Sequence, residues 1–367
     1  MVVRVGNIIT YAPKSTYKAG DADPAGAYMF FTSSSDEDKR IGTYQFDCEG
    51  IIMGTGGNAT LHYYSGRFSV STDCVVIVPN ERIRCKYLYY FFLANMRILE
   101  EGFKGAGLKH TNKNYISNIE VGDIPSISEQ ERIVSILDIA YRVICERKTQ
   151  LRTLDALIKA RFVEMFGDPV FNNMCWQTRP LEEVCRTIVD CPHSTPNYTS
   201  EDTGYMCIRT SIVKKNHIMW DEIEYISEDE FIQRIQRKKP EKGDVIYTRE
   251  GAILGIAAVI DRDCNVALGQ RSMLLSPDTE ACTAEFLSVA MNFDSFLNNA
   301  LKGMSGSASP HINVGDIKAF QMILPPIEQQ RAFSIFFQQI DKSKVVVQSA
   351  LDKAQTLFDS LMQQYFG

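Results

Sequence analysis

The chain has 367 residues, of which 45% are hydrophobic and 23% charged, and its formal net charge is −6. This length and composition exclude wholesale disorder and predict a globular protein of two or three domains. No apolar run reaches the roughly 18 residues of a membrane-spanning helix, and no charged and then apolar leader opens the chain, so we expect a cytoplasmic protein. The negative charge by itself gives no sign of a nucleic-acid partner.

The ten cysteines are scattered along the chain. None forms a CxxC pair, and none stands at zinc-ligand spacing from a histidine. We therefore expect reduced thiols that act as small apolar core residues, and no metal site.

The first 126 residues are expected to form an α+β domain. Residues 73–79 predict a buried strand that ends at a proline, and residues 86–96 a short helix. The glycine-rich residues 54–57 fit either a tight turn or a phosphate cradle, and the lack of a lysine and of a following helix favours the turn. Residues 104–113 contain three lysines and no acidic residue.

A long amphipathic helix is predicted over residues 127–167. Ser128 and Glu131 have the spacing of a capping box, and Pro125 keeps the preceding chain extended. We expect the helix to end at Gly167. Its apolar residues recur at steps of three and four: Ile133, Leu137, Ala140, Ile144, Leu151, Leu154, Ile158 and Met165.

The rest of the chain repeats this organisation. Residues 168–325 predict a second α+β domain, and residues 326–367 a second long helix. The expected elements of that domain are strands at 243–248, 256–260 and 272–277 and a helix at 284–299. The second long helix has apolar residues with a period of 3.5 residues: Phe333, Phe336, Ile340, Val347, Ala350, Ala354, Leu357 and Leu361.

Short matched segments indicate an internal duplication. They keep the same order in both halves and predict two units, each a variable globular part followed by a helix. The matches are Gly50 and Thr55 with Gly243 and Thr248, His110 and Asn112 with His311 and Asn313, residues 129–132 with 328–331, and Phe166-Gly167 with Phe366-Gly367.

Each helix of about 39 residues would be roughly 58 Å long, and its narrow apolar stripe needs a partner helix. The simplest solution pairs the two helices with each other as an antiparallel coiled coil, with a pseudo-twofold axis at mid-length. The alternative is that each helix packs on its own domain. The expected helix-pair residues are Leu137, Ile144, Leu151, Leu154, Ile158, Phe336, Ile340, Val347, Leu357 and Leu361.

No catalytic constellation is present in the sequence. It contains no P-loop, no GxGxxG after a strand, no GxSxG, no HExxH and no Asn/Asp-Pro-Pro-aromatic methyltransferase motif. The five histidines are too scattered to be assigned as metal ligands. These observations predict a binding and scaffolding protein that holds no cofactor.

Basic residues cluster in loops at matching places of the two halves. Glycine allows the backbone to approach a phosphate, Lys and Arg add charge, and Ser, Thr, Asn and His can reach base edges. A single such loop fits a solvated flexible segment better than a DNA contact, but the matched positions in two divergent units make duplex DNA an equally good interpretation. The candidate DNA-binding residues are Lys104, Lys109, His110, Thr111, Asn112, Lys113, Arg234, Arg237, Lys238, Lys239, Arg249, Lys302, Ser305, Ser307, Ser309, His311 and Asn313.

Four segments together resemble a known family: residues 243–251, the loop that ends at 311–313, residues 324–331 before the second helix, and residues 166–169. In this order they are similar to the specificity (S) subunits of type I restriction–modification systems. The resemblance covers target-recognition domain 1 (1–126), a conserved helix (127–167), target-recognition domain 2 (168–325) and a second conserved helix (326–367). The sequence departs from the family pattern in two ways. The chain is short and starts almost inside the first domain, and residues 50–57 lack an arginine equivalent to Arg249.

The resemblance implies a non-catalytic subunit. Each recognition domain would bind one half of a split, asymmetric DNA target, and the helices would set the spacing. Two methyltransferase (M) subunits would dock around the helices and methylate adenine with S-adenosylmethionine, and a restriction/translocase (R) subunit can join. The alternatives are a specificity subunit of a related bipartite system, an enzyme with an unrecognised site, and a coiled-coil adaptor without a DNA role.

Overall fold

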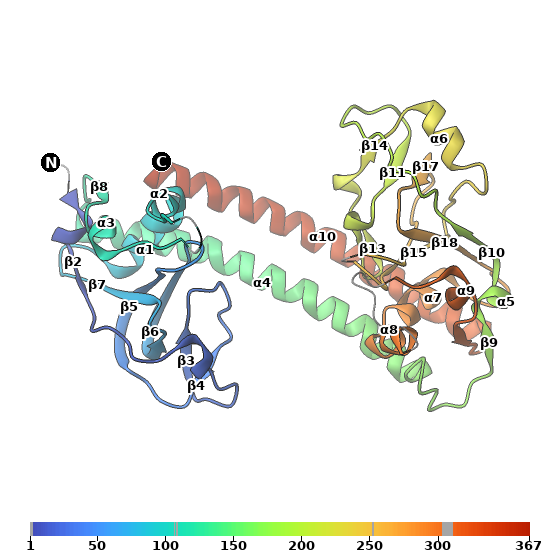
Figure 1. Ribbon diagram of the computed structural model, residues 1–367, viewed down its shortest axis with the longest axis horizontal. Helices are drawn as coiled ribbons and strands as arrows, with labels where there is room; N and C mark the ends of the chain where they lie inside the picture. The colour runs from blue at the N-terminus through green and yellow to red at the C-terminus, as the bar shows by residue number, and fades with distance from the viewer. Residues whose placement is uncertain (1–2, 106, 108, 252, 303–310) are drawn as a thin grey trace. The chain divides into compact units, whose positions relative to one another are not determined.

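The computed structural model describes residues 3–105, 107, 109–251, 253–302 and 311–367. The chain divides into two compact units, unit 1 (Met1–Thr149 with Gln348–Gly367) and unit 2 (Gln150–Val347). Each unit combines an α+β globular part with a segment of both long helices, α4 (Ile127–Phe166) and α10 (Ile327–Phe366) (Figure 1). The predicted class, two tandem α+β domains with two long helices, is confirmed.

Unit 1 is built on a six-stranded sheet with the order β2-β7-β5-β6-β3-β4. The central strand β5 pairs antiparallel with β6 and β7, and helix α1 packs on these three strands. The strands are β1 (Val3–Arg4), β2 (Ile9–Tyr11), β3 (Tyr28–Phe31), β4 (Arg40–Ile41), β5 (Phe46–Gly54), β6 (Leu61–Val70), β7 (Cys74–Pro79) and β8 (Glu120–Gly122). The short helices are α1 (Cys85–Ala94), α2 (Met96–Glu101) and α3 (Lys113–Ser117).

Unit 2 has a central sheet with the order β10-β18-β15-β16, on which α7 packs. A three-stranded sheet, β14-β11-β17, and the ribbon β12-β13 complete its globular part (Figure 1). The strands are β9 (Thr178–Pro180), β10 (Cys185–Asp190), β11 (Met206–Ile208), β12 (Val213–Lys214), β13 (His217–Ile218), β14 (Glu224–Tyr225), β15 (Val245–Thr248), β16 (Ala257–Val259), β17 (Val266–Leu268), β18 (Ser272–Pro277) and β19 (Gln321–Ile323). The short helices are α5 (Leu181–Val184), α6 (Glu228–Arg234), α7 (Ala284–Met291), α8 (Asp294–Leu301) and α9 (Val314–Lys318).

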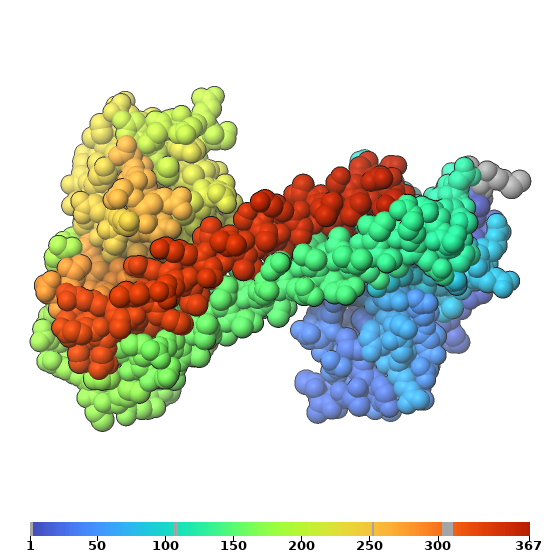
Figure 2. Space-filling view, turned by 180° about the vertical axis from the view of Figure 1, so that it is seen from behind, coloured from blue at the N-terminus to red at the C-terminus, as the bar shows by residue number. Residues whose placement is uncertain are grey.

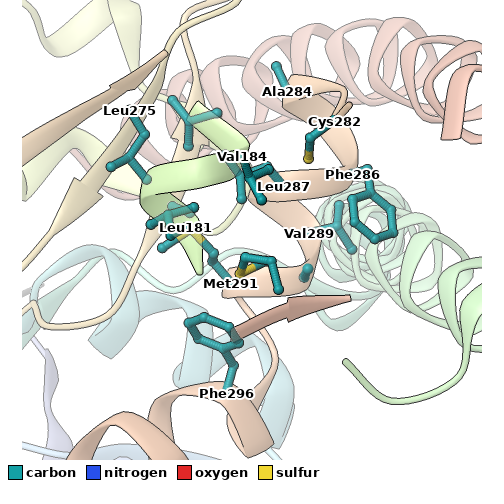
Figure 3. Close-up of a cluster of buried hydrophobic side chains, with 14 of the residues drawn as sticks. Leu181, Val184, Leu275, Cys282, Ala284, Phe286, Leu287, Val289, Met291 and Phe296 are labelled. Atoms are coloured by element: carbon teal, nitrogen blue, oxygen red, sulfur yellow. The ribbon is translucent and has the colours of Figure 1, made fainter. Parts of the chain in front are cut away.

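The main core of unit 2 lies where α5, β18 and α7 meet. Leu181 of α5, Leu275 of β18 and Leu287 of α7 point toward one another and are fully buried (Figure 3). The ring of Phe286 stacks on Phe162 of α4, with centroids 5.2 Å apart. The long helix is therefore part of the core of this unit.

Strand register shows which residues of the two units are equivalent. Gly54 of β5 pairs with Cys74, and Thr248 of β15 pairs with Ser272. Gly54 therefore corresponds to Thr248, and the sequence match of Thr55 with Thr248 is wrong by one residue. This shift matters because neighbouring strand residues point to opposite faces of a sheet.

Within each unit, the segments of α4 and α10 lie side by side and run antiparallel (Figure 2). In unit 1, Tyr141 contacts Phe358 with ring centroids 5.9 Å apart, and Arg132 lies beside Tyr365. In unit 2, Phe166 contacts Phe333 at 5.6 Å, and Lys344 Nζ lies 2.6 Å from Asp155 Oδ1. Residue numbers rise along one helix as they fall along the other, which confirms the antiparallel pairing in each unit; the pseudo-twofold axis stays a prediction.

Most of the predicted helix-pair residues line the cores that contain both helices. Leu137 and Ile144 share a cluster with Phe358 and Met362 and with the half-buried Leu361, whereas Ile158 shares one with Phe333 and the half-buried Phe336 and Ile340. Leu151, Leu154 and Val347 are half-buried. The prediction for Leu357 is wrong: its side chain is 56% exposed, and its neighbour Phe358 is the buried residue.

A buried glutamine joins each long helix to its globular part. Gln130 accepts from Arg84 N at 2.7 Å and donates to Arg82 O and Pro125 O at 3.2 and 2.9 Å. Gln330 accepts from Thr283 N at 3.1 Å and donates to Ala281 O and Pro325 O at 3.1 and 2.8 Å. Gln330 is thus the equivalent of Gln130, whereas the match of 129–132 with 328–331 pairs Gln130 with Gln329. A shift of one residue turns a helix by about 100°, so that alignment would expose the glutamine.

The ends of α4 follow the expected chemistry with one correction. Ser126, and not Ser128, caps the helix, because its Oγ accepts from Glu129 N at 3.3 Å. Gly167 ends the helix with φ +75°, a conformation that favours glycine.

Candidate nucleic-acid interface

In each unit, the ends of three neighbouring strands lie close together at the same end of the sheet. In unit 1, β2 and β5 both run antiparallel to β7; Gly54 ends opposite Cys74 at the start of β7, and Tyr11 ends opposite Ile77, three residues further along. In unit 2, β10 and β15 run antiparallel to β18 in the same way, so Asp190 and Thr248 end beside its start. We call the loops at these places head edge 1 (residues 55–57, 73 and 109–113) and head edge 2 (residues 190–195, 249–251, 270–271 and 311–313).

Head edge 1 joins a glycine turn to the lysine loop. Thr111 N donates to Thr55 O at 3.0 Å, and Gly57 N donates to Lys109 O at 2.9 Å. The His110 ring lies against Gly56, where an added Cβ would come within 3.1 Å of it. Gly57 has φ +83°, so the glycines form a turn that a bulkier residue would strain.

Head edge 2 repeats this arrangement with different side chains. Ile312 N donates to Arg249 O at 2.8 Å, Glu250 forms an isolated bridge with His311, and Gly251 has φ +91°. The two histidines and the two turn glycines thus occupy equivalent positions. The matched asparagines, Asn112 and Asn313, directly precede α3 and α9.

The predicted basic residues of head edge 1 are exposed, as a DNA contact requires. Lys104, Lys109, His110 and Lys113 all lie on the surface, and Lys113 Nζ lies 4.8 Å from the centre of the Tyr11 ring. The Thr111 side chain is half-buried. Asn112 Oδ1 accepts from Tyr115 N at 2.9 Å and caps α3, so that oxygen serves the fold.

Arg249 has a structural role, contrary to the sequence prediction. Its side chain is only 8% exposed. Its Nε and Nη2 lie 2.9 and 3.3 Å from the two carboxylate oxygens of Asp190, which ties the end of β15 to the end of β10. His193 Nε2 lies 3.2 Å from the same carboxylate.

Two more predicted DNA contacts are internal. The Arg234 side chain is 3% exposed, pairs with Glu230 at 3.1 Å, and donates to Ser194 O at 2.8 Å. The Lys238 side chain is 18% exposed and lies 3.0 and 3.1 Å from Glu241 and Asp244. Both cations are paired with carboxylates and have little exposed surface, so they are unavailable to phosphates.

The remaining predicted cations of unit 2 are exposed. Arg237 lies on the surface and donates to Asp190 O at 3.2 Å, and Lys239 donates to Asn265 at 2.9 Å. Lys302 is exposed directly after α8, and His311 and Asn313 are exposed before α9. Ser305, Ser307 and Ser309 lie outside the described residues.

Two surface residues that the sequence did not single out complete the head edges. Asp73 and Arg271 stand directly before β7 and β18, and both are exposed. Arg271 has φ +68°, which is uncommon for a residue with a side chain. The only sequence signal was their place at the start of a predicted strand, which identifies no function.

Cysteine chemistry gives no reactive site in the cores. Burial raises the pKa of the Cys185 and Cys207 thiols to about 12, so both stay protonated at neutral pH. Across residues 3–105, 107, 109–251, 253–302 and 311–367, no group of three His, Cys, Asp or Glu side chains could hold a metal ion. None of the helices in these ranges is long and apolar enough to cross a bilayer.

Comparison with protein families identifies the chain. A model described as type I restriction modification DNA specificity domain matches residues 1–153 and 173–350. The chain belongs to this family. The two matched ranges correspond to the two halves of the internal duplication, so the specificity-domain family accounts for both.

Curated and solved relatives extend along nearly the whole chain. The type I restriction enzyme MjaVIII specificity subunit of Methanocaldococcus jannaschii is 22% identical, covering 97% of this chain and 91% of its own. The type I restriction enzyme EcoDI specificity subunit of Escherichia coli is 23% identical, covering 95% and 84%. A crystal structure of the type I S subunit from M. genitalium matches the fold with a TM-score of 0.68 at 12% identity, covering 100% of this chain and 96% of that one.

Proposed function

We propose that this chain is the DNA specificity subunit of a type I restriction–modification complex, in which each unit binds one half of a bipartite target. The observation that carries this proposal is the repeated head edge. Both units present a glycine turn with positive φ and an exposed histidine at the same sheet edge, surrounded by different side chains. A main-chain arrangement that is common to both units but carries different side chains suits the binding of two different half-sites.

Phosphate contacts would come from the exposed lysines of the head edges. Lys104, Lys109 and Lys113 surround the turn of head edge 1, and Lys302 precedes the matching loop of unit 2. Phosphate contacts orient a protein on DNA, whereas base edges provide the sequence information. The overall negative charge is compatible with this role because residues 104–113 carry three lysines and no acidic residue, so this loop is positively charged.

Exposed apolar residues on the long helices support the docking of methyltransferase subunits. Leu157 and Leu357, which are 44% and 56% exposed, occupy equivalent positions of α4 and α10. Val345 and Val346 are 61% and 70% exposed. One equivalent site on each helix fits two M subunits, which would bind S-adenosylmethionine and methylate adenine. This chain would contribute no catalytic group or cofactor, and an R subunit would join the same assembly.

Methylome sequencing of cells that carry this chain with its M subunit tests the function. We expect methylated adenines within a split target of two unlike half-sites. Lengthening one long helix should change the spacer between the half-sites. Methylation at a single continuous site, or a constant spacer, would contradict the proposal.

Charge reversal tests the DNA-facing surface. Lys109→Glu with Lys113→Glu should weaken binding to all duplex sequences and lower the slope of log affinity against log salt by about 0.9 for each lost phosphate contact. Arg67→Glu is the matched control, because Arg67 is exposed and pairs with Asp47 near the opposite edge of the sheet. Equal salt slopes for all three proteins would remove the lysines from the interface.

A further inference from the structure

Asp73 and Arg271 occupy the same position in the two units. Thr55 N donates to Asp73 O at 2.7 Å, and Arg249 N donates to Arg271 O at 3.0 Å. Each residue is followed directly by the strand that pairs with the end of β5 or β15. The equivalence therefore rests on main-chain hydrogen bonds, although the side chains differ completely.

Two neighbours of this position are the same in both units. A turn glycine with positive φ and an exposed histidine stand beside it in both. At this position unit 1 presents a carboxylate where unit 2 presents a guanidinium. Contacts to the sugar-phosphate backbone can be common to both units, but the contact that distinguishes two half-sites has to differ.

We propose that Asp73 and Arg271 are equivalent specificity-determining residues, which contact a base in the half-site of unit 1 and of unit 2 respectively. The proposal rests on the proposed function and adds the chemical class of the base contact. Asp73 would accept from the exocyclic amino group of cytosine, and Arg271 would donate to O6 and N7 of guanine.

The carboxylate gives the strongest argument. An exposed aspartate on a DNA-binding surface is repelled by phosphates, and an amino group on a base edge is the DNA partner that suits it. Within the described residues, no hydrogen bond or ion pair involves the Asp73 carboxylate, so it is available to a ligand. Its carbonyl oxygen accepts from Thr55 N, Thr55 Oγ1 and Ser33 Oγ, which fixes the main chain at this residue.

Arg271 has the features of a positioned donor. Its side chain is 57% exposed, and Nε lies 3.9 Å from Glu250 Oε1, too far for a hydrogen bond. Nη1 extends over Gly251, where an added Cβ would lie 3.4 Å away. The φ of +68° is a strained conformation for arginine, and such strain is often retained where function needs it.

Selection from a randomised duplex library, using the full chain with its M subunits, tests the proposal. Asp73→Asn should change or relax one base pair in the half-site of unit 1 and leave the other half-site unchanged. Arg271→Gln should do the same in the half-site of unit 2. For Arg271→Gln we expect the preference at that base pair to fall about 5- to 150-fold, the range for a lost bidentate contact, and for Asp73→Asn a fall toward the lower end of that range. Asp73→Glu and Arg271→Lys, which keep the charge, should also alter the preference.

Matched controls lie near the opposite ends of the strands. Asp47→Asn on β5 and Arg186→Gln on β10 remove the same charges from exposed positions and should leave the selected sequence unchanged. Unchanged targets for all four head-edge variants would overturn the inference while leaving the bipartite function intact. So would a uniform loss of affinity with a smaller salt slope, which indicates phosphate contacts. Failure of the wild-type protein to select any split target would instead refute the proposed function.

Discussion

Replacing Gln330 by leucine should strongly destabilise unit 2. The Gln330 side chain is fully buried, and its amide satisfies one main-chain N–H and two carbonyl oxygens where α10 meets the start of α7. Leucine has a similar size but cannot form these bonds. A buried polar group without a partner costs about 1–3 kcal/mol, so three such groups predict a loss of about 3–9 kcal/mol. For a unit of this size, that loss lowers the melting temperature by about 6–36 °C.

Tryptophan fluorescence provides the assay for unit 2 alone. The two tryptophans of the chain, Trp176 and Trp220, both lie in this unit. Urea unfolding followed by their emission therefore measures the free energy of unfolding of unit 2. Gln339→Leu is the matched control, since Gln339 is exposed on the same helix and its replacement should change stability by less than about 0.5 kcal/mol. A loss below about 1 kcal/mol for Gln330→Leu would refute the role of the buried amide.

Three further predictions follow from the same contacts. Arg249→Leu should destabilise unit 2 by about 3–5 kcal/mol, because it leaves the Asp190 carboxylate in a poorly solvated site without its arginine partner. Urea unfolding measures this loss. A variant of unchanged stability with a reduced salt slope for DNA binding would contradict the prediction. Leu357→Glu should leave the melting temperature unchanged but weaken the binding of M subunits in a pull-down. Phe358→Glu should unfold unit 1, because Phe358 is buried. The reverse pattern would show that Leu357 belongs to the helix pair. His217 lies on the surface, but partial desolvation of its ring and the nearby Lys344 lower its pKa, so the unfolded chain binds the proton first as the pH falls below about 6.5. Unit 2 should therefore lose stability on acidification from pH 7, and His217→Gln should reduce that loss in urea titrations at several pH values.

The sequence predicted the long helices well because their signals are local. The apolar period, the glycine stop at Gly167 and the repeated segments all depend on residues near one another in the chain. The sequence did not decide which of two adjacent apolar residues of a helix is buried. Leu357 and Phe358 are both apolar, and contacts of the Phe358 ring with Tyr90 and Tyr141, at 6.2 and 5.9 Å, decide which one is buried.

The candidate DNA surface was predicted only in part. The lysines near residue 110 could be found because a run without acidic residues is visible in the sequence. Arg249 was also predicted to face DNA, but its partner Asp190 lies 59 residues away in the chain. Sequence clustering therefore cannot separate a cation that is free to bind phosphate from one that is neutralised by a distant carboxylate.

The sequence by itself determined that two similar α+β units each continue into a long amphipathic helix, since hydrophobic period, caps and repeats act over short stretches of chain. Only the tertiary structure decided which charges are buried, that Gln330 rather than Gln329 is the equivalent of Gln130, and that Asp73 and Arg271 share one position. Those facts depend on hydrogen-bond register between segments far apart in the chain, and a shift of one residue reverses which side chains face the core and which face a ligand.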